Sequence, residues 1–283
     1  MKICIDAGHY GKYNRSPAVK SYYESDMAWK LHLLLKKQLE EYSGVTVITT
    51  RASQNADLAL EKRGKMASGC DLFISIHSNA VGSYISEGTD YPLACCSVSG
   101  KVDALGQKLA QCVQKTMGTS QTGRITKRKL ANGKDYYGVL RGAAAVGVSG
   151  VLLEHSFHTN TKSTNWLLND SNLEKLAKAE AEVIAAHYGL KKKVFIGATD
   201  ATESAFQPYK VKVICSSLNI RKTPKWGNSD VVGTIKDKGV YTIIDECMLE
   251  GTKFGLLKSA VDSKGVNHRN RWISLGSAYV KKV

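Results

Sequence analysis

The hydrophobic pattern of this 283-residue chain changes its period once, and that change constrains the fold more than any other feature. Up to about residue 190, short apolar runs alternate with amphipathic helical patterns. The runs lie at 2–6, 45–50, 72–77, 136–140 and 150–154, and the helical patterns lie at 24–42, 58–68, 102–117 and 171–189. Such alternation predicts an α/β fold, in which a mixed twisted sheet is flanked by helices. Ser171 and Glu174 are predicted to form a capping box, and Gly189 to end the last helix.

From about residue 209 the apolar residues recur at every second position, as they do in strands with one buried face. The runs lie at 211–213, 218–220, 231–235 and 240–244, with turn residues between them. Many short strands in about 75 residues predict a small all-β barrel. We therefore expect three parts, which are a catalytic domain at 1–190, a linker at 191–208 and the all-β domain at 209–283.

Charge and targeting signals narrow the possible functions. The net charge is +15, and residues 191–283 carry 17 Lys and Arg against 8 Asp and Glu, a net +9. That excess favours a polyanionic partner, either nucleic acid or an anionic bacterial wall polymer. No apolar run approaches the roughly 18–20 residues of a membrane span. Because Asp6 follows the first five residues at once, no signal peptide is expected, and synthesis in the cytoplasm is predicted.

Three segments each place a possible metal ligand at the end of a strand or the start of a helix. His9 follows the first apolar run, Glu24 begins the first helix, and His77 ends the run at 72–77. Two histidines and a glutamate suit a catalytic zinc with an open position for water. Each residue also has a simpler interpretation: His9 and His77 as polar residues at strand ends, and Glu24 as the partner of Ser21 in a capping box.

Glu154 ends the apolar run at 150–154, and it is predicted to reach the same edge of the sheet. Partial desolvation there would raise the pKa of its carboxyl toward the value that a general base needs. A buried salt bridge is the alternative. His155 should point away from Glu154 by strand alternation, so His155 and His158 are interpreted as structural residues.

Four motifs carry a resemblance to a known family: IDAGHYG at 5–11, YESDMAW at 23–29, DLFISIHSNA at 71–80 and GVLLEHSFHTN at 150–160. Together they resemble the zinc-dependent N-acetylmuramoyl-L-alanine amidases of bacteria and their phages. The resemblance implies that His9, Glu24 and His77 bind one Zn²⁺ per chain and that Glu154 is the catalytic glutamate. It also implies cleavage of the amide between the lactyl group of muramic acid and L-alanine. The chain departs from the family pattern at Ser156, where glycine is common, and near Val148, where a proline is missing.

Substrate contacts are harder to place. The basic segment at 123–135 is interpreted either as a mobile loop that meets peptide carboxylates or as a solvated run of charge. Arg141 and Asn79 are weaker candidates for substrate binding.

The C-terminal part resembles bacterial Src-homology-3-like wall-binding domains, on the strength of residues 218–224 and 272–275. Its aromatic residues are candidates for lining a peptide groove, although half or more of them are expected to be core. They are Trp226, Tyr241, Trp272 and Tyr279. The stretch at 253–271 departs from the short pattern of such domains and is interpreted as an insertion.

The expected partner is therefore bacterial peptidoglycan, with no nucleic acid bound, and the oligomeric state is not predicted. The enzyme would reach the wall after host lysis or by exit through a pore. Two alternatives stay open at this point: a zinc peptidase that cuts within stem peptides, and a wall-binding protein with an inactive amidase fold.

Overall fold

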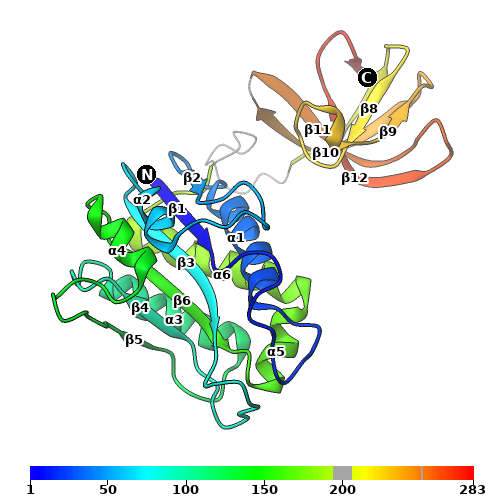
Figure 1. Ribbon diagram of the computed structural model, residues 1–283. Coiled ribbons are helices and arrows are strands. Elements are labelled where there is room, and N and C mark those ends of the chain that lie inside the picture. Colours follow the sequence, from blue (N-terminus) through cyan, green and yellow to red (C-terminus); the bar gives the residue numbers. More distant parts are fainter. Residues whose placement is uncertain (194–205, 250) are drawn as a thin grey trace. The chain divides into compact units, whose positions relative to one another are not determined.

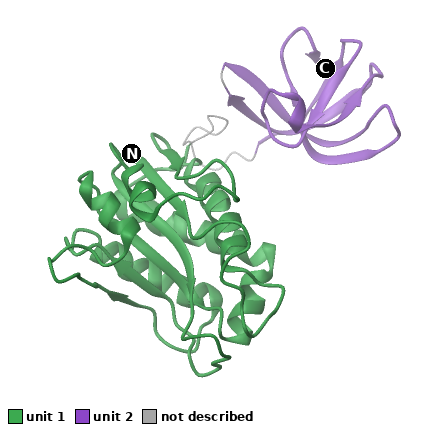
Figure 2. Cartoon of the chain, in the orientation of Figure 1, with its two compact units in different colours: residues 1–193 green, residues 194–283 purple. Residues whose placement is uncertain are grey.

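A computed structural model describes residues 1–193, 206–249 and 251–283. The chain divides into two compact units, Met1–Lys193 and Val194–Val283 (Figure 2). The first three residues of the expected linker belong to the first unit, because the backbone N–H of Ser43 donates to the Lys191 carbonyl at 2.8 Å. Most of the linker, 194–205, lies outside the described residues. Within the described ranges, no helix is both long enough and apolar enough to cross a membrane.

The first unit is built on a six-stranded mixed sheet with the order β2-β1-β3-β6-β4-β5. Strands β2, β1, β3 and β6 run parallel, whereas β4 runs antiparallel to β6 and β5 parallel to β4. The predicted mixed sheet is therefore confirmed. The strands are β1 (Lys2–Ala7), β2 (Thr46–Thr49), β3 (Leu72–Asn79), β4 (Leu93–Cys96), β5 (Arg124–Thr126) and β6 (Gly150–Phe157).

Helices cover both faces of this sheet (Figure 1). On one face, α1 (Glu24–Leu39), α3 (Asp103–Met117) and α6 (Asp170–Tyr188) pack against the strands through fully buried residues such as Leu31, Leu109 and Ile184. On the other face lie α2 (Leu60–Lys65) and α4 (Gly138–Ala145). The short helix α5 (Thr161–Leu168) precedes α6.

Glycines let α2 and α4 touch backbone to backbone. A Cβ at Gly64 of α2 would lie 2.0 Å from the carbonyl oxygen of Val139, and one at Gly142 of α4 would lie 2.2 Å from that of Glu61. No side chain fits at either position, so the two helices form one tightly packed layer.

Two predictions about local structure were wrong in this unit. The run at 136–140, predicted as a strand, begins helix α4, because Val139, Leu140 and Ala143 meet the sheet on one helical face. A run of five apolar residues does not distinguish the two periods. The edge strand β5 instead lies within the basic segment that was interpreted as a loop.

The predicted capping box of the last helix was also wrong. Asn169 is the N-cap of α6, and its side-chain oxygen accepts from the backbone N–H groups of Ser171 and Asn172. Asparagine is among the best N-cap residues, and here it precedes the serine that the prediction chose. The predicted stop at Gly189 is confirmed, with φ of +65° in the left-handed region that glycine favours.

The second unit is a seven-stranded sheet with the order β13-β7-β10-β11-β12-β8-β9, in which the pairs are antiparallel. This confirms the prediction of a separate all-β part. The stretch at 253–271 provides most of the hairpin β11–β12 in the middle of the sheet, so it is part of the core framework. The elements are β7 (Tyr209–Val213), β8 (Leu218–Arg221), η1 (Asn228–Asp230), β9 (Val231–Ile235), β10 (Val240–Leu249), β11 (Thr252–Val261), β12 (Asn267–Ser274) and β13 (Val280–Lys282).

Candidate metal centre and catalytic glutamate

Three side chains meet at the carboxyl ends of β1 and β3, as the sequence predicted. One ligand atom from each of His9, Glu24 and His77 lies within 4.8 Å of the other two. The carboxylate of Glu24 is central, with Oε2 at 3.2 Å from His9 Nε2 and Oε1 at 2.8 Å from His77 Nδ1. Glu24 is only 2% exposed, whereas the two imidazoles are partly open to solvent. The carboxylate of the cluster is therefore buried, whereas the histidine rings beside it can be reached from the solvent.

Glu24 occupies the first position of α1, but it does not cap the helix. The N-cap is Tyr23, which makes no side-chain capping bond, so the alternative pairing with Ser21 is wrong. Instead Oε1 accepts from the backbone N–H of Ser78 at 3.1 Å, and Oε2 accepts from Asn14 Nδ2 at 2.7 Å. These bonds turn the carboxylate toward the histidines.

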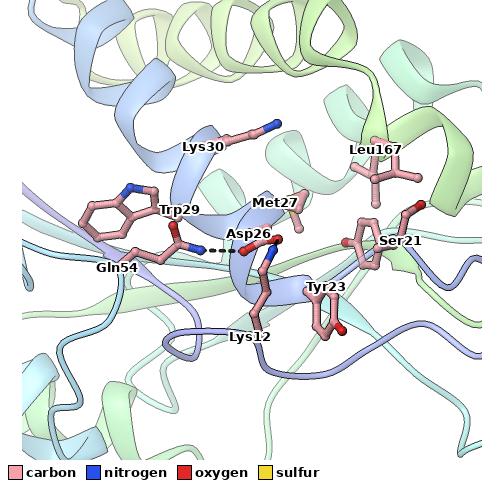
Figure 3. Close-up of a pocket in the computed structure, with 11 residues that line it drawn as sticks. Lys12, Ser21, Tyr23, Asp26, Met27, Trp29, Lys30, Gln54 and Leu167 are labelled. Carbon is pink, nitrogen blue, oxygen red and sulfur yellow. Dashed lines mark hydrogen bonds and ion pairs between the residues drawn. The ribbon is translucent and has the colours of Figure 1, made fainter.

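Polar contacts on the outer side of α1 hold the turn that carries Glu24 (Figure 3). Asp26 accepts from Gln54 Nε2 at 2.6 Å and pairs with Lys12, beside a hollow of about 460 Å³. Ser25 Oγ accepts from the backbone N–H of Tyr13 at 2.9 Å. The first turn of the helix is thereby tied to the loop that follows His9 and to the loop that follows β2.

Gly8 makes room for the ring of His77, and not for that of its sequence neighbour His9. Its N–H donates to the Ile76 carbonyl at 2.9 Å, and a Cβ there would lie 2.5 Å from Cε1 of His77. The space left by the missing side chain is therefore filled by the His77 ring. His9 itself has φ of +57°, an uncommon conformation for a non-glycine residue, which turns its imidazole back over the cluster.

A buried chain of hydrogen bonds leads from His77 into the sheet. Ser75 Oγ lies 3.1 Å from His77 Nε2 and donates to Asp6 Oδ2 at 2.8 Å. Because the one hydroxyl proton goes to the carboxylate, Ser75 can only accept from Nε2–H, so Nδ1, which faces Glu24, is the nitrogen that could bind a metal. Thr50 donates to the other oxygen of Asp6, which is fully buried.

Glu154 lies directly beside this cluster, because it pairs with His77 across β3 and β6. The side chain is half-buried, yet its Oε2 is buried and has no hydrogen-bond partner within the described part of the chain. Burial, with the charge of Glu24 second, raises the pKa of the Glu154 carboxyl well above its usual value. Burial also opposes ionisation of Glu24, but hydrogen bonds from His77 and His9 outweigh it and lower that pKa. One carboxyl is thus kept ionised, and its neighbour readily takes up a proton.

The sequence and the fold of the first unit are similar to those of known proteins. Residues 3–186 match the family described as N-acetylmuramoyl-L-alanine amidase. The chain belongs to this family. The endolysin of Bacillus phage SPP1 is 30% identical over 267 residues, which cover 92% of this chain and 93% of the endolysin. The N-acetylmuramoyl-L-alanine amidase CwlM of Bacillus licheniformis is 27% identical over 194 residues, covering 68% of this chain and 70% of CwlM.

A solved structure shares the fold of the first unit. The catalytic domain of CwlV, an N-acetylmuramoyl-L-alanine amidase from Bacillus (Paenibacillus) polymyxa var. colistinus, superposes with a TM-score of 0.56 at 22% identity. The match covers 67% of this chain and 99% of the CwlV domain. Family membership makes this chain an enzyme of the amidase type, a hydrolase of peptidoglycan.

Two further histidines of the amidase have structural partners. His155 is fully buried and lies 2.7 Å from Glu180 of α6 and 2.9 Å from the backbone carbonyl of His77. Burial lowers the pKa of His155, but the Glu180 charge and hydrogen bond more than compensate and raise it. His158 Nδ1 bonds to Ser78 and stays 4.0 Å from Glu24 Oε2. The predicted turn of His155 away from Glu154 is confirmed.

The weaker sequence candidates make internal contacts. Arg141 Nε donates to Glu61 Oε1 at 2.7 Å, and its Nη1 donates to the carbonyl of Asp135 at 2.9 Å. Asn79 Oδ1 accepts from the backbone N–H of Ala80 at 2.8 Å. These bonds occupy part of each side chain, and a role in binding substrate stays a prediction.

Sequence reasoning missed Asn14, Ser75 and Glu180. Of these, only Ser75 could have been predicted from the sequence, because strand alternation places it on the same face of β3 as His77. The unusual Ser156 is explained by the structure: its φ of +60° is one that glycine adopts without strain, and its hydroxyl donates to Asp90 at 2.7 Å.

Proposed function

We propose that the enzyme hydrolyses the amide between the lactyl group of N-acetylmuramic acid and the L-alanine of the stem peptide. One observation carries this proposal. Two imidazoles and a carboxylate converge at the sheet edge, and the strand beside them presents a second carboxyl, whose buried Oε2 has no hydrogen-bond partner among the described residues. Family membership favours this amide over the other amides of the wall.

The ligand cluster fits zinc. His9, Glu24 and His77 form a set of two nitrogen donors and one oxygen donor, which matches catalytic zinc sites with a free fourth position. We propose that these three residues hold one Zn²⁺ per chain. When bound, zinc would lower the pKa of a water molecule and polarise the amide carbonyl. The hydrogen bond that His77 Nε2–H donates to Ser75 supports the same assignment, because it leaves Nδ1 as the nitrogen that can bind the metal.

Glu154 is proposed as the general base and acid. Because no residue in the described ranges bonds to its buried Oε2, this oxygen is available to take a proton from the attacking water. It then returns that proton to the alanine nitrogen as the carbon–nitrogen bond breaks. A pKa raised by burial and by Glu24 brings the carboxyl closer to the pH at which it must both accept and donate.

We further propose that residues 1–190 form the catalytic domain and that 209–283 form a Src-homology-3-like wall-binding domain. Its net charge of +9, counted from residue 191, suits the anionic polymers of a wall. Trp226 is 46% exposed and borders a hollow of about 100 Å³ together with Arg221 and Tyr279. Of the four candidate aromatic residues, these observations favour Trp226 and Tyr279 as ligand contacts.

Mass spectrometry of a digest of purified walls tests the proposed bond. We expect intact glycan with free lactyl carboxyl groups and stem peptides that begin with a new alanine N-terminus. A zinc peptidase would instead release fragments whose new N-terminus lies inside the stem peptide, and that product would overturn the proposal. Failure of the pure, zinc-loaded protein to cleave walls would favour the alternative of an inactive binding protein.

A further inference from the structure

A row of side chains extends from the ligand cluster across three strands beyond β3. His77 pairs with Glu154 of β6, Glu154 with Leu93 of β4, and Leu93 with Arg124 of β5. Directly paired residues project from the same face of a sheet. The next row confirms the alternation, because its members pack into the core on the opposite face; they are Ile76, Leu153, Ala94 and Ile125.

Arg124 ends this row as an oriented and uncompensated cation. Its guanidinium carbon lies 3.7 Å from the centroid of the Tyr91 ring, and Tyr91 in turn packs edge-on against Phe157 at 4.8 Å. Among the residues that the structure describes, no acidic side chain pairs with Arg124, whereas the neighbouring Lys127 pairs with Asp103 at 2.5 Å. An arginine stacked on a ring keeps its N–H donors available for a carboxylate.

The spacing of the row suits a peptide that crosses the strands. Adjacent strands lie about 4.8 Å apart, so Arg124 is about 10 Å from Glu154 along the backbone row. An extended peptide covers that distance in about three residues. Leu93, which is half-buried, provides an apolar surface between the two charged groups.

The chemistry of the substrate decides which part reaches Arg124. The lactyl carboxyl of the sugar is consumed in the amide, so the sugar side of the scissile bond carries hydroxyl and acetamido groups. The peptide side keeps its free carboxylates. We propose that Arg124 forms a subsite for a carboxylate of the stem peptide, within about three residues of the scissile amide. This inference rests on the proposed function and adds the direction in which the peptide lies.

A second basic pair offers a rival position. Arg15 and Lys20 border a hollow of about 390 Å³ on the side of the cluster where Asn14 and His158 lie. Arg15 already donates from Nε to the backbone carbonyl of Lys20 at 2.6 Å. The row from Glu154 to Arg124 is favoured because its register places the cation at a definite distance from the proton carrier, and its side chains are partly or fully exposed.

Steady-state kinetics with two substrates tests the subsite. One is an N-acetylmuramoyl tripeptide with free carboxylates, and the other is the same compound with those carboxylates as amides. Hydrogen bonds to charged groups are worth about 1.5–3 kcal/mol, which corresponds to roughly ten- to hundredfold in binding. We expect Arg124→Gln to raise KM for the acid at least about tenfold, to change kcat little, and to leave the amidated substrate unaffected. Arg124→Lys, which keeps the charge, should recover part of the loss.

Two variants serve as controls. Lys175→Gln removes one exposed positive charge from α6, on the opposite face, and should leave both substrates unchanged. Arg15→Gln should also leave their ratio unchanged. The subsite is refuted if Arg124→Gln affects both substrates equally or neither, or if Arg15→Gln or Lys175→Gln removes the preference for the acid. If the wild-type enzyme cleaves the bond between the lactyl group and L-alanine equally well in both substrates, the subsite alone is refuted. If it cleaves that bond in neither substrate, the proposed function is refuted as well.

Discussion

Replacement of Ser75 by alanine should weaken zinc binding without touching a ligand. The hydroxyl joins His77 Nε2 at 3.1 Å to Asp6 Oδ2 at 2.8 Å, and it sets which imidazole nitrogen carries the lone pair. Loss of such an outer contact lowers metal affinity by roughly 10–100-fold. Asp6 also loses one of its hydrogen bonds in the core, which should reduce the free energy of unfolding by about 1–3 kcal/mol.

Thr50→Val separates these two effects. Thr50 donates to the other oxygen of the same carboxylate, so its replacement by an isosteric residue also removes one hydrogen bond from Asp6. It leaves the bond between Ser75 and His77 in place. Competition with a chromophoric chelator measures zinc affinity, and urea unfolding of the metal-free proteins measures stability. We expect both variants to be destabilised and only Ser75→Ala to bind zinc more weakly. Equal zinc affinities in the two variants would refute the reasoning.

Three further predictions concern the base, the helix packing and the acid response. Glu154→Gln should lower kcat on walls by roughly 10²–10⁴-fold while zinc content, measured by mass spectrometry, stays at the wild-type level; activity near wild type would exclude Glu154 as the base. Gly64→Ala places a methyl group 2.0 Å from the Val139 carbonyl, so urea unfolding should show a loss of at least about 1–3 kcal/mol, and an unchanged midpoint would contradict the packing. Although burial opposes ionisation of Asp90, hydrogen bonds from Ser163 and its neighbours lower the pKa of that carboxyl. Its stabilising effect is therefore complete above the unfolded pKa of about 3.9 and is lost as pH falls through the lower, folded value. Asp90→Asn should reduce stability at pH 7 and flatten its decline in acid, and a decline as steep as that of wild type would contradict this assignment.

The sequence predicted the cluster well because each of its members follows a strong local pattern. His9 and His77 end apolar strands, and parallel strands bring their carboxyl ends to one edge of a sheet. Glu24 begins a long amphipathic helix whose buried stripe determines how it packs. In each case, local patterning and general rules of sheet geometry are enough to bring the residue to the site.

Contacts that depend on the register between distant segments could not be predicted from the sequence. The bond between Ser75 and Asp6 exists because β1 and β3 pair those two residues, and no local pattern sets that pairing. Glu180 reaches His155 only because of how α6 packs against the sheet. The error at 136–140 has a different origin: the apolar run is too short to show a period, and helix α4 is decided by packing against α2.

The most direct test of the metal centre returns zinc to chelated enzyme in measured equivalents while mass spectrometry follows the products released from purified walls. We predict no cleavage without metal and a linear rise that ends at one equivalent per chain, with every new peptide N-terminus an alanine. Cleavage that persists after chelation, or that requires more than one zinc per chain, would contradict a single catalytic zinc held by His9, Glu24 and His77.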